Sequence, residues 1–506
     1  VNAGSGGQTV TQGGGAAVED NAPVIKGSST ENTVTINAEK DQTANVTIED
    51  VNIDMSVAGK AAVSTTGEGN VNIELNGSNA LKSGHSHAGL EKNNDGNLTI
   101  QDKDKDGSLN ANGGQDGAGI GGGVYGNGSD ITITGGKVTA RGGNYGAGIG
   151  GGAYGNGSDI TVTGGEVTAN SGNHGAGIGG GGWGNGNNIT ISSGKVTATG
   201  GMFAAGIGGG MHRDGNDITI SGGEVSAAGG RCGAGIGGGG SQTSNAGSGT
   251  NIKITGGRVT AVGGNYSAGI GGGYGSNGEN ITISDAEVIA IGGTCAAGIG
   301  GGCRLGNGIV GQGTNISISG SANVKAAGGV GDSMDGAGAG GSRQGTTAQE
   351  GAADTSGLSP DGSVERLDPG TTFDIPQPKP RSSFPKPAPD PVAVEEEPQP
   401  VKAALYRVID DAGKALPVET KQEDGVLLLT AQADIAILEG AISGLETLQS
   451  RGIDTITFTN GTISVSFSLA EVIAKGASSD IYRLTLSGGE ANFTLADADI
   501  TALLGK

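Results

Sequence analysis

The sequence predicts an all-β protein, built mainly as a right-handed parallel β-helix with three sheets and followed by a linker and a small α+β domain. Three observations lead there: 109 glycines in 506 residues, a recurring phrase Ala-Gly-Ile-Gly-Gly, and short alternations of aliphatic residues with threonine. Glycine does not stand strictly at every third position, which excludes a collagen triple helix. We therefore expect a solenoid in which each repeat forms one coil.

The recurring phrase has a nearly constant period. Its isoleucine returns in steps of 29 residues, with one step of 34 caused by a five-residue insertion at 241–245. The isoleucines are Ile120, Ile149, Ile178, Ile207, Ile236, Ile270 and Ile299. Less regular copies on both sides extend the predicted β-helix over 25–341, after a flexible segment 1–24.

Each repeat holds three short extended stretches separated by glycine-rich corners. In one repeat they are 147–149, 160–163 and 166–169, and Ile160 and Val162 alternate with threonines. This period of two indicates a strand with one buried face, and glycine supplies the positive φ of a tight corner. Three strands and three corners make one coil.

One column of the predicted stack alternates in charge. Equivalent residues of stacked coils lie about 4.8 Å apart, so like charges in one column would repel. The column reads Lys137, Glu166, Lys195, Glu224, Arg258 and Glu287. Its sign changes at every step, as a parallel stack requires.

The repeat pattern ends near residue 341. Eleven of the 13 prolines lie between Pro360 and Pro400, which predicts an extended linker over 342–401. The remainder, 402–506, predicts a small α+β domain without histidine or cysteine. Its expected elements are an amphipathic helix over 432–450, hairpins over 453–466 and 481–495, and a short helix opened by a capping box at 468–471. We expect this domain to act as a spacer or to dock a protein partner.

Composition and charge exclude several classes of function. The chain has 29 basic and 51 acidic residues, a net charge of −22, and an acidic surface repels phosphate, so nucleic acid is not an expected partner. No apolar run approaches the roughly 18–20 residues of a spanning helix, so no transmembrane segment is expected. Three cysteines give neither a disulfide framework nor a zinc spacing.

The variable positions around the repeated phrase are rich in rings. The set that follows the glycine run is Tyr125, Tyr154, Trp183, His212 and Tyr274. The set that precedes the phrase includes Tyr145, His174, Phe203 and Tyr266. Flat rings on a rigid surface suit stacking on sugars, with polar edges for hydroxyl contacts. They equally suit a cover for the corner glycines, and the sequence leaves both interpretations open.

A run of alternating aspartates is a candidate calcium site. Asp102, Asp104 and Asp106 stand at positions 1, 3 and 5 of an EF-hand-type loop, with Gly107 at position 6. Gly113 stands where position 12 requires a bidentate glutamate. The alternative interpretation is a solvated turn between two strands.

No catalytic residue is identified. Glycosidases and lyases on β-helices need several carboxylates that converge on one face, whereas most acids here stand singly beside Lys or Arg. Four acids stand apart without a telling spacing: Asp116, Asp217, Glu279 and Asp285. The histidines form no metal pattern. We favour a non-enzymatic role, and Lys253 interrupts the threonine array that an ice-binding solenoid would need.

The repeat Gly-Ala-Gly-Ile-Gly-Gly-Gly…Ile-Thr-Ile-Thr-Gly-Gly-Lys-Val-Thr-Ala resembles glycine-rich β-helix segments of clostridial, gut-type bacterial surface proteins. The opening coils (46–53, 71–75 and 98–100) resemble carbohydrate-binding β-helix domains of that group, within the pectate-lyase-like superfamily. The resemblance implies a secreted or cell-surface bacterial module that binds a plant or host polysaccharide, with calcium as a cofactor in some relatives. That adds weight to Asp102, Asp104 and Asp106. The expected function is an adhesive carbohydrate-binding module; the alternatives are a polysaccharide-degrading hydrolase or lyase and a structural scaffold.

Overall fold

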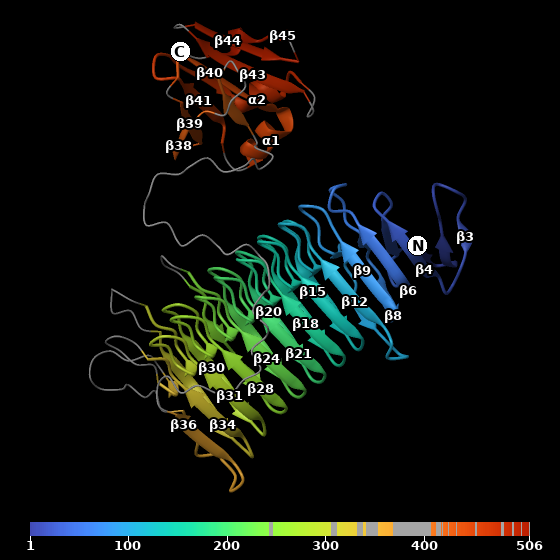
Figure 1. The fold of residues 1–506 in the computed structure, drawn as a ribbon, viewed down its shortest axis with the longest axis vertical. Helices are drawn as coiled ribbons and strands as arrows, with labels where there is room; N and C mark the ends of the chain where they lie inside the picture. The colour runs from blue at the N-terminus through green and yellow to red at the C-terminus, as the bar shows by residue number, and fades with distance from the viewer. Residues whose placement is uncertain are drawn as a thin grey trace. The chain divides into compact units, whose positions relative to one another are not determined.

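A computed structural model describes the chain in two compact units, Val1–Ser382 and Ser383–Lys506. The described residues are 1–241, 246–304, 311–330, 337–340, 353–367, 406–410, 416, 418–423, 425–431, 433–450, 453–476, 480–487, 490–496 and 498–504. The first unit is a parallel β-helix, as the repeat predicts (Figure 1). The predicted insertion lies, apart from Ser241, outside the described residues.

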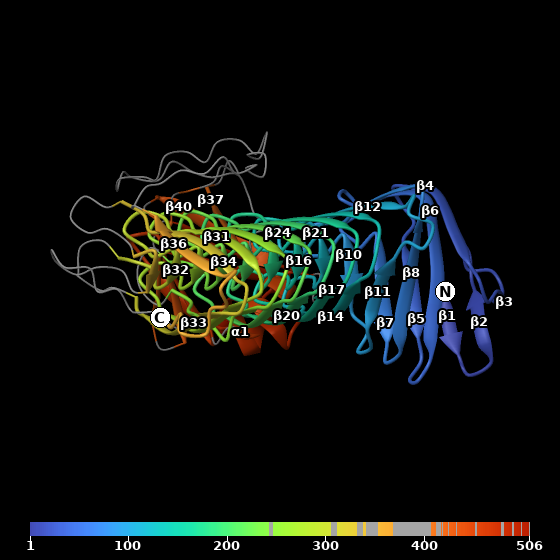
Figure 2. The ribbon, with the colours of Figure 1, turned by 90° about the horizontal axis from the view of Figure 1, so that it is seen from below.

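Three parallel ladders of strands run along the β-helix, on different sides of it (Figure 2). The first ladder consists of β1 (Asn2–Gly4), β5 (Val34–Ala38), β7 (Val63–Gly67), β10 (Leu90–Lys92), β13 (Ile120–Gly121), β16 (Ile149–Gly150), β19 (Ile178–Gly179), β22 (Ile207–Gly208), β25 (Ile236–Gly237), β29 (Ile270–Gly271), β32 (Ile299–Gly300) and β35 (Ala339–Gly340). The second consists of β4 (Val24–Ser29), β6 (Thr43–Asp54), β8 (Asn70–Asn76), β11 (Leu98–Gln101), β14 (Gly128–Ile133), β17 (Gly157–Val162), β20 (Gly186–Ile191), β23 (Gly215–Ile220), β26 (Gly249–Thr250), β27 (Lys253–Ile254), β30 (Gly278–Ser284) and β33 (Gly313–Ser319). The third consists of β9 (Ser78–Lys82), β12 (Ser108–Asn112), β15 (Lys137–Arg141), β18 (Glu166–Asn170), β21 (Lys195–Thr199), β24 (Glu224–Ala228), β28 (Arg258–Val262), β31 (Glu287–Ile291), β34 (Asn323–Ala327) and β36 (Ser363–Leu367).

Residues that pair between neighbouring coils are one sequence repeat apart. Ile149 pairs with Ile178, and Glu166 pairs with Lys195, each one repeat apart. Inside, Ile160 and Val162 of β17 are fully buried, while Thr161 between them faces outward and is half-buried. The alternation read from the sequence is therefore confirmed, and the buried aliphatic columns stabilise the stack by roughly 1.5–3 kcal/mol per side chain.

One corner position in each regular coil has a positive φ, which asparagine and aspartate adopt more readily than most residues do. Asp159, Asn188 and Asp217 have φ of 53°, 49° and 55°. These residue types tolerate the left-handed region better than others do. Further along, Asn251 Nδ2 donates to Asp217 Oδ1 at 3.0 Å and Asn280 Nδ2 donates to Asn251 Oδ1 at 3.1 Å. The column is thus both a corner and a hydrogen-bonded ladder.

Both ends of the β-helix differ from the boundaries expected from the sequence. Residues 1–24 include β1, which pairs in parallel with β5, and the antiparallel strands β2 (Gly7–Val10) and β3 (Val18–Glu19). The side chain of Gln8 accepts a hydrogen bond from Asn45 N at 2.6 Å and donates one to Asn45 O at 3.0 Å. At the other end, β36 lies beyond residue 341 and pairs with β34. These strands cover sheet edges that would otherwise expose unpaired backbone groups.

The second unit contains two sheets and short helices. One sheet has the order β37 (Arg407–Ile409), β40 (Ile435–Ala441), β43 (Ile481–Ser487), β44 (Glu490–Leu495) and β45 (Ala498–Asp499). The other has the order β38 (Glu419–Glu423), β39 (Val426–Thr430), β41 (Thr455–Thr459) and β42 (Ser464–Ser468). The helices are α1 (Ile442–Ser450), α2 (Leu469–Ile473) and the 3₁₀ turn η1 (Thr501–Leu503). No helix in the described residues is long and apolar enough to span a membrane.

The predicted hairpins of this unit are confirmed, and the predicted helix over 432–450 is wrong in its first half. β41 pairs antiparallel with β42, and β43 with β44. Ile435–Ala441 forms β40, which pairs with β37 and β43. Ala436, Ile437 and Leu438 of β40 are buried in succession, so both faces of the strand are covered, and such a run cannot be told from a helix by periodicity. Helix α2 begins at Leu469, without a side-chain cap bond from Ser468.

Candidate functional site

Most of the rings predicted from the sequence meet in one stacked cluster on the side of the β-helix. Tyr125, Tyr154 and Trp183 stack in a row, with centroids 5.2 Å and 4.6 Å apart and interplanar angles of 17° and 10°. Tyr145 and His174 form a second row, with centroids 4.6 Å apart, and Trp183 stacks on both. The cluster, which we call the aromatic ladder, comprises Tyr125, Tyr145, Tyr154, His174, Trp183 and Phe203.

The coil geometry sets the spacing of these rings. Tyr125, Tyr154 and Trp183 are 29 residues apart, so each ring lies one coil from the next, near the spacing of parallel strands. Tyr154 N donates to Gly182 O at 2.7 Å, and Tyr125 N donates to Ala153 O at 2.8 Å. Backbone hydrogen bonds between coils therefore hold the rings in register.

The first row has an unusual backbone. Tyr125, Tyr154, Trp183 and His212 have φ of 60°, 65°, 65° and 65°. For a residue other than glycine, asparagine or aspartate, this conformation costs roughly 1–2 kcal/mol. In the coil of Ile270 the corresponding place is taken by Gly275, with φ of 69°. The rings therefore stand where a glycine would fit without strain.

The stacking decides which parts of the rings a ligand can reach. Tyr154 stacks between Tyr125 and Trp183, so a sugar can approach it only at its edge. Tyr125, at the end of the row, stacks on Tyr154 alone among the ring pairs of the described chain, which leaves its outer face free of a second ring. Tyr125 is 63% exposed and Tyr154 52% exposed. The ladder thus offers one ring face and a row of ring edges.

Among the six ladder residues, His174 is the one whose side chain can gain a charge near neutral pH. Burial lowers the pKa of its imidazole, a hydrogen bond with the backbone of Asn144 opposes that effect, and His212 on the next coil lowers the pKa further. Its buried Nδ1 has no hydrogen-bond partner in the described residues. The ring is therefore neutral at pH 7 and acts as a flat surface in the stack.

Three predicted ring residues are not members of the ladder as defined above: His212, at the equivalent position one coil beyond Trp183, and Tyr266 and Tyr274. Tyr266 and Tyr274 form an edge-to-face pair of their own, with centroids 5.6 Å apart. Tyr274 stands four residues after Ile270, whereas Trp183 stands five after Ile178, so the two belong to different columns. In the next coil the same two columns hold Cys295 and Cys303, which form a disulfide. Three cysteines at irregular spacing did not predict this bond, because the two positions meet only when the coil folds.

Two histidines near the start of the repeats carry carboxylate partners that their spacing did not predict. His87 Nδ1 lies 2.8 Å from Glu91 Oε2, and His85 Nδ1 lies 3.3 Å from Asp116 Oδ2. Glu91 is buried and also accepts from Ala88 N at 3.0 Å. Such carboxylates fix the orientation of an imidazole.

The predicted calcium loop folds as a tight turn. Asp102 Oδ1 accepts a hydrogen bond from Lys105 N at 2.8 Å, and Asp102 Oδ2 accepts one from Gly107 N at 3.1 Å. Asp104 and Asp106 are exposed. Across the described part of the chain, no three side chains of His, Cys, Asp or Glu gather where they could hold a metal ion. Calcium at this loop stays a prediction.

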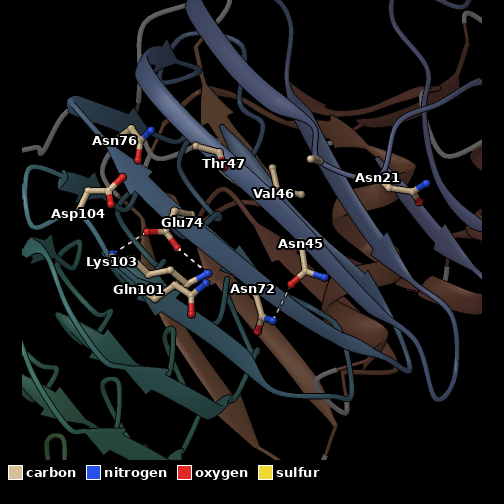
Figure 3. Close-up of a pocket in the computed structure, with 11 residues that line it drawn as sticks. Asn21, Asn45, Val46, Thr47, Asn72, Glu74, Asn76, Gln101, Lys103 and Asp104 are labelled. Atoms are coloured by element: carbon tan, nitrogen blue, oxygen red, sulfur yellow. Dashed lines mark hydrogen bonds and ion pairs between the residues drawn. The ribbon is translucent and has the colours of Figure 1, made fainter.

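A polar cavity of about 330 Å³ lies on the outer face of strands β6, β8 and β11 (Figure 3). Thr47, Glu74 and Gln101 form one row across these strands, since their backbones are paired. Asn21 lies at one side of the cavity, and Lys103 and Asp104 of the aspartate turn line it at the other. Asn45, Asn72 and Asn76 complete the amide-rich lining.

Two acceptors in this cavity lack hydrogen-bond donors. Glu74 Oε1 accepts from Lys103 N at 2.6 Å, but the buried Glu74 Oε2 has only the ammonium of Lys103, 3.6 Å away. The buried Oδ1 of Asn76 has no hydrogen-bond partner among the described residues either. An unmet buried acceptor costs about 1–3 kcal/mol, so both favour an occupant that donates hydrogen bonds. The sequence carried a signal: Asn72 and Glu74 replace the threonine pair that later coils show on this face.

Comparison with known proteins agrees with the fold. Seven segments match the model of a β-helix repeat family: 105–124, 131–153, 160–182, 189–211, 218–240, 252–274 and 281–303. Tyr145, His174 and Phe203 lie within these segments, whereas Tyr125, Tyr154 and Trp183 fall just outside them, and the cavity lies entirely before the first segment. No curated protein and no solved structure matches the chain.

Proposed function

We propose that the β-helix is an extracellular carbohydrate-binding, adhesive surface module that uses the aromatic ladder. The observation that carries this proposal is the exposure of a rigidly stacked row of rings at a strained backbone position. Rings that only covered corner glycines would be buried, whereas Tyr125 and Tyr154 are more than half exposed. A strained conformation repeated in four coils indicates that these side chains contribute something glycine cannot.

The free face of Tyr125 is the place for a sugar ring to stack. The phenol groups of Tyr125 and Tyr154 and the indole N–H of Trp183 then follow along the row, one coil apart. Amphipathic rings of this kind combine an apolar face with a polar edge, which suits a sugar's apolar face and its hydroxyls. An extended polysaccharide alongside the coils would contact several of them at once.

Two further features support an extracellular place of action. The disulfide between Cys295 and Cys303 suits an oxidising compartment, because such bonds are rare where thiols are kept reduced. The match to β-helix repeats suits a surface protein related to polysaccharides. The second unit, which has its own core, is proposed to dock a protein partner.

A depletion assay tests the proposed function. The full chain is mixed with a panel of insoluble plant polysaccharides and mucin, and both retained protein and released sugar are measured. We expect retention without release, and we expect Tyr125→Ala and Tyr154→Ala each to weaken retention about tenfold, because each removes a contact worth about 1–1.5 kcal/mol.

The matched control is Val57→Ala, which truncates another exposed apolar side chain of the β-helix, 99% exposed. It should bind as the unmodified chain does. Retention that survives both tyrosine substitutions would refute the ladder as the binding surface. Released sugar would instead make the protein a polysaccharide-degrading enzyme, and neither retention nor release would favour a scaffold. A parallel series with chelator tests the calcium prediction.

A further inference from the structure

We propose that the polar cavity on β6, β8 and β11 is a second binding subsite, for a neutral, hydroxyl-rich sugar unit. The choice of a sugar rests on the proposed function, but the site and its residues are separate from the aromatic ladder. The ladder recognises through ring faces and edges, whereas this cavity recognises through amides and a carboxylate. Figure 3 shows these groups gathered on one outer face of the β-helix.

The chemistry of the lining selects the ligand class. Within the described part of the chain, the buried atoms Glu74 Oε2 and Asn76 Oδ1 are acceptors without donors, so an occupant that reaches them must donate hydrogen bonds. The amide groups of Asn76 and Gln101 can each both donate and accept, as sugar hydroxyls do. Lys103, Glu74 and Asp104 bring one positive and two negative charges to the cavity, which disfavours a polyanion. A neutral sugar meets all of these conditions.

Lys103 is the movable part of the site. Its side chain is 73% exposed, while that of Glu74 is only 17% exposed, and the two are 3.6 Å apart. The ammonium is too far for a hydrogen bond and covers the buried oxygen without satisfying it. When the ammonium swings outward into solvent, a sugar hydroxyl takes its place and donates to Glu74 Oε2 at hydrogen-bond distance.

The rest of the cavity is held in place before any ligand binds. Asn72 Nδ2 donates to Asn45 Oδ1 at 2.9 Å, and Gln8 N donates to Asn21 Oδ1 at 2.9 Å. The turn on the far side is fixed by the two hydrogen bonds to Asp102. A preformed polar site loses little freedom on binding, which favours affinity. The aspartate turn therefore serves as a wall of a sugar site.

Calorimetric titration with neutral gluco-, galacto- and manno-oligosaccharides, in the presence of chelator, tests the subsite. Glu74→Gln keeps the shape but replaces an acceptor by a donor, and Asn76→Leu keeps the size without polar atoms. Each should raise the dissociation constant about tenfold, because Glu74→Gln removes a hydrogen bond to a charged acceptor and Asn76→Leu removes one to a buried amide. Thr161→Ala, on the same outer face three coils further along, is the matched control and should leave the constant unchanged.

The outcomes separate this proposal from the proposed function. Loss of binding in Glu74→Gln and Asn76→Leu, with Tyr125→Ala unchanged for the same short sugar, supports the subsite. Loss in Tyr125→Ala alone overturns the subsite and leaves the ladder standing. Binding of no neutral sugar overturns the subsite whatever the ladder does. In a separate titration with calcium and no chelator, calcium binding that Glu74→Gln abolishes would also overturn it, since the cavity would then be a metal site. Circular dichroism checks that each variant is folded.

Discussion

At the scale of single residues, each regular coil has two non-glycine positions with positive φ, and they hold different kinds of residue. Asp159 and Asn188 occupy one of them, as their residue types predict. Tyr154 and Trp183 occupy the other, where a ring gains nothing from the backbone. Their stacking returns roughly 0.5–1.5 kcal/mol per pair, which offsets much of the strain. The rings persist because neighbouring coils carry rings too, so the ladder is a collective property of the repeats.

We predict that glycine is the better replacement at the end of the ladder. Tyr125→Ala loses the stack on Tyr154 and keeps the strained φ, whereas Tyr125→Gly loses the stack and relieves the strain. The glycine variant should be about 1 kcal/mol more stable than the alanine variant in urea denaturation followed by circular dichroism.

The matched control is Tyr145, which lies in the same ladder but is not among the residues with positive φ. There the order should reverse, with Tyr145→Gly less stable than Tyr145→Ala by roughly 0.5–1 kcal/mol. The same order at both positions would show that left-handed strain does not govern the ladder.

Some residues of the candidate sites could be predicted from the sequence, and others could not. The ring columns were visible, because a period of 29 marks Tyr125, Tyr154 and Trp183 as equivalent. The stacking of Trp183 on Tyr145 and His174 was not visible, because it joins two columns that come together only in the folded coil. Glu74 and Asn76 were missed because their site combines strands with the turn at Asp104 and the segment at Asn21. A local sequence pattern cannot predict that segments so far apart in the sequence lie close together.

At the scale of elements, side-chain columns outside the core fix the register of the coils. Lys137 and Glu166 lie 3.6 Å apart, and Arg258 and Glu287 lie 3.0 Å apart, as the alternating charges predict. The strands of the β-helix could be predicted because the same strand pattern recurs in every repeat. The strand β40 had no such copies, and its apolar residues, taken together with those of α1, have the spacing of an amphipathic helix, although β40 pairs with β37 and β43.

Reversing one sign in the charge column should weaken the stack. Glu224 pairs with Lys195 on one side and Arg258 on the other, so Glu224→Lys places three positive charges on consecutive coils. We expect a loss of about 0.5–1 kcal/mol of stability at low salt, because exposed charges interact weakly. The loss should shrink at 1 M salt, where the screening length is about 3 Å.

Glu224→Gln serves as the control, since it removes the attraction without adding repulsion. Its loss should be smaller and less dependent on salt. A Glu224→Lys variant as stable at low salt as the unmodified chain would mean that the alternation plays no part in stabilising the coils.

At the scale of the whole molecule, the described residues contain two large hydrophobic cores, one in each compact unit. One is the aliphatic interior of the β-helix, and the other contains the aromatic side chains Phe458, Phe467, Tyr482 and Phe493 of the second unit. A solenoid gains its stability from contacts between neighbouring coils, and its ends need strands that close the stack. Here β1 and β36 supply them.

The separate cores predict two independent unfolding transitions in calorimetry of the full chain. Ile207 is fully buried and stacks between Ile178 and Ile236, so Ile207→Ala should destabilise the β-helix by about 2–5 kcal/mol and lower its transition alone. Phe458 is fully buried in the second core, so Phe458→Ala should lower only the other transition, by about 3–5 kcal/mol. Each variant is the control for the other. If each substitution lowered both transitions, the two units would unfold as one, and the separate cores would be a single cooperative structure.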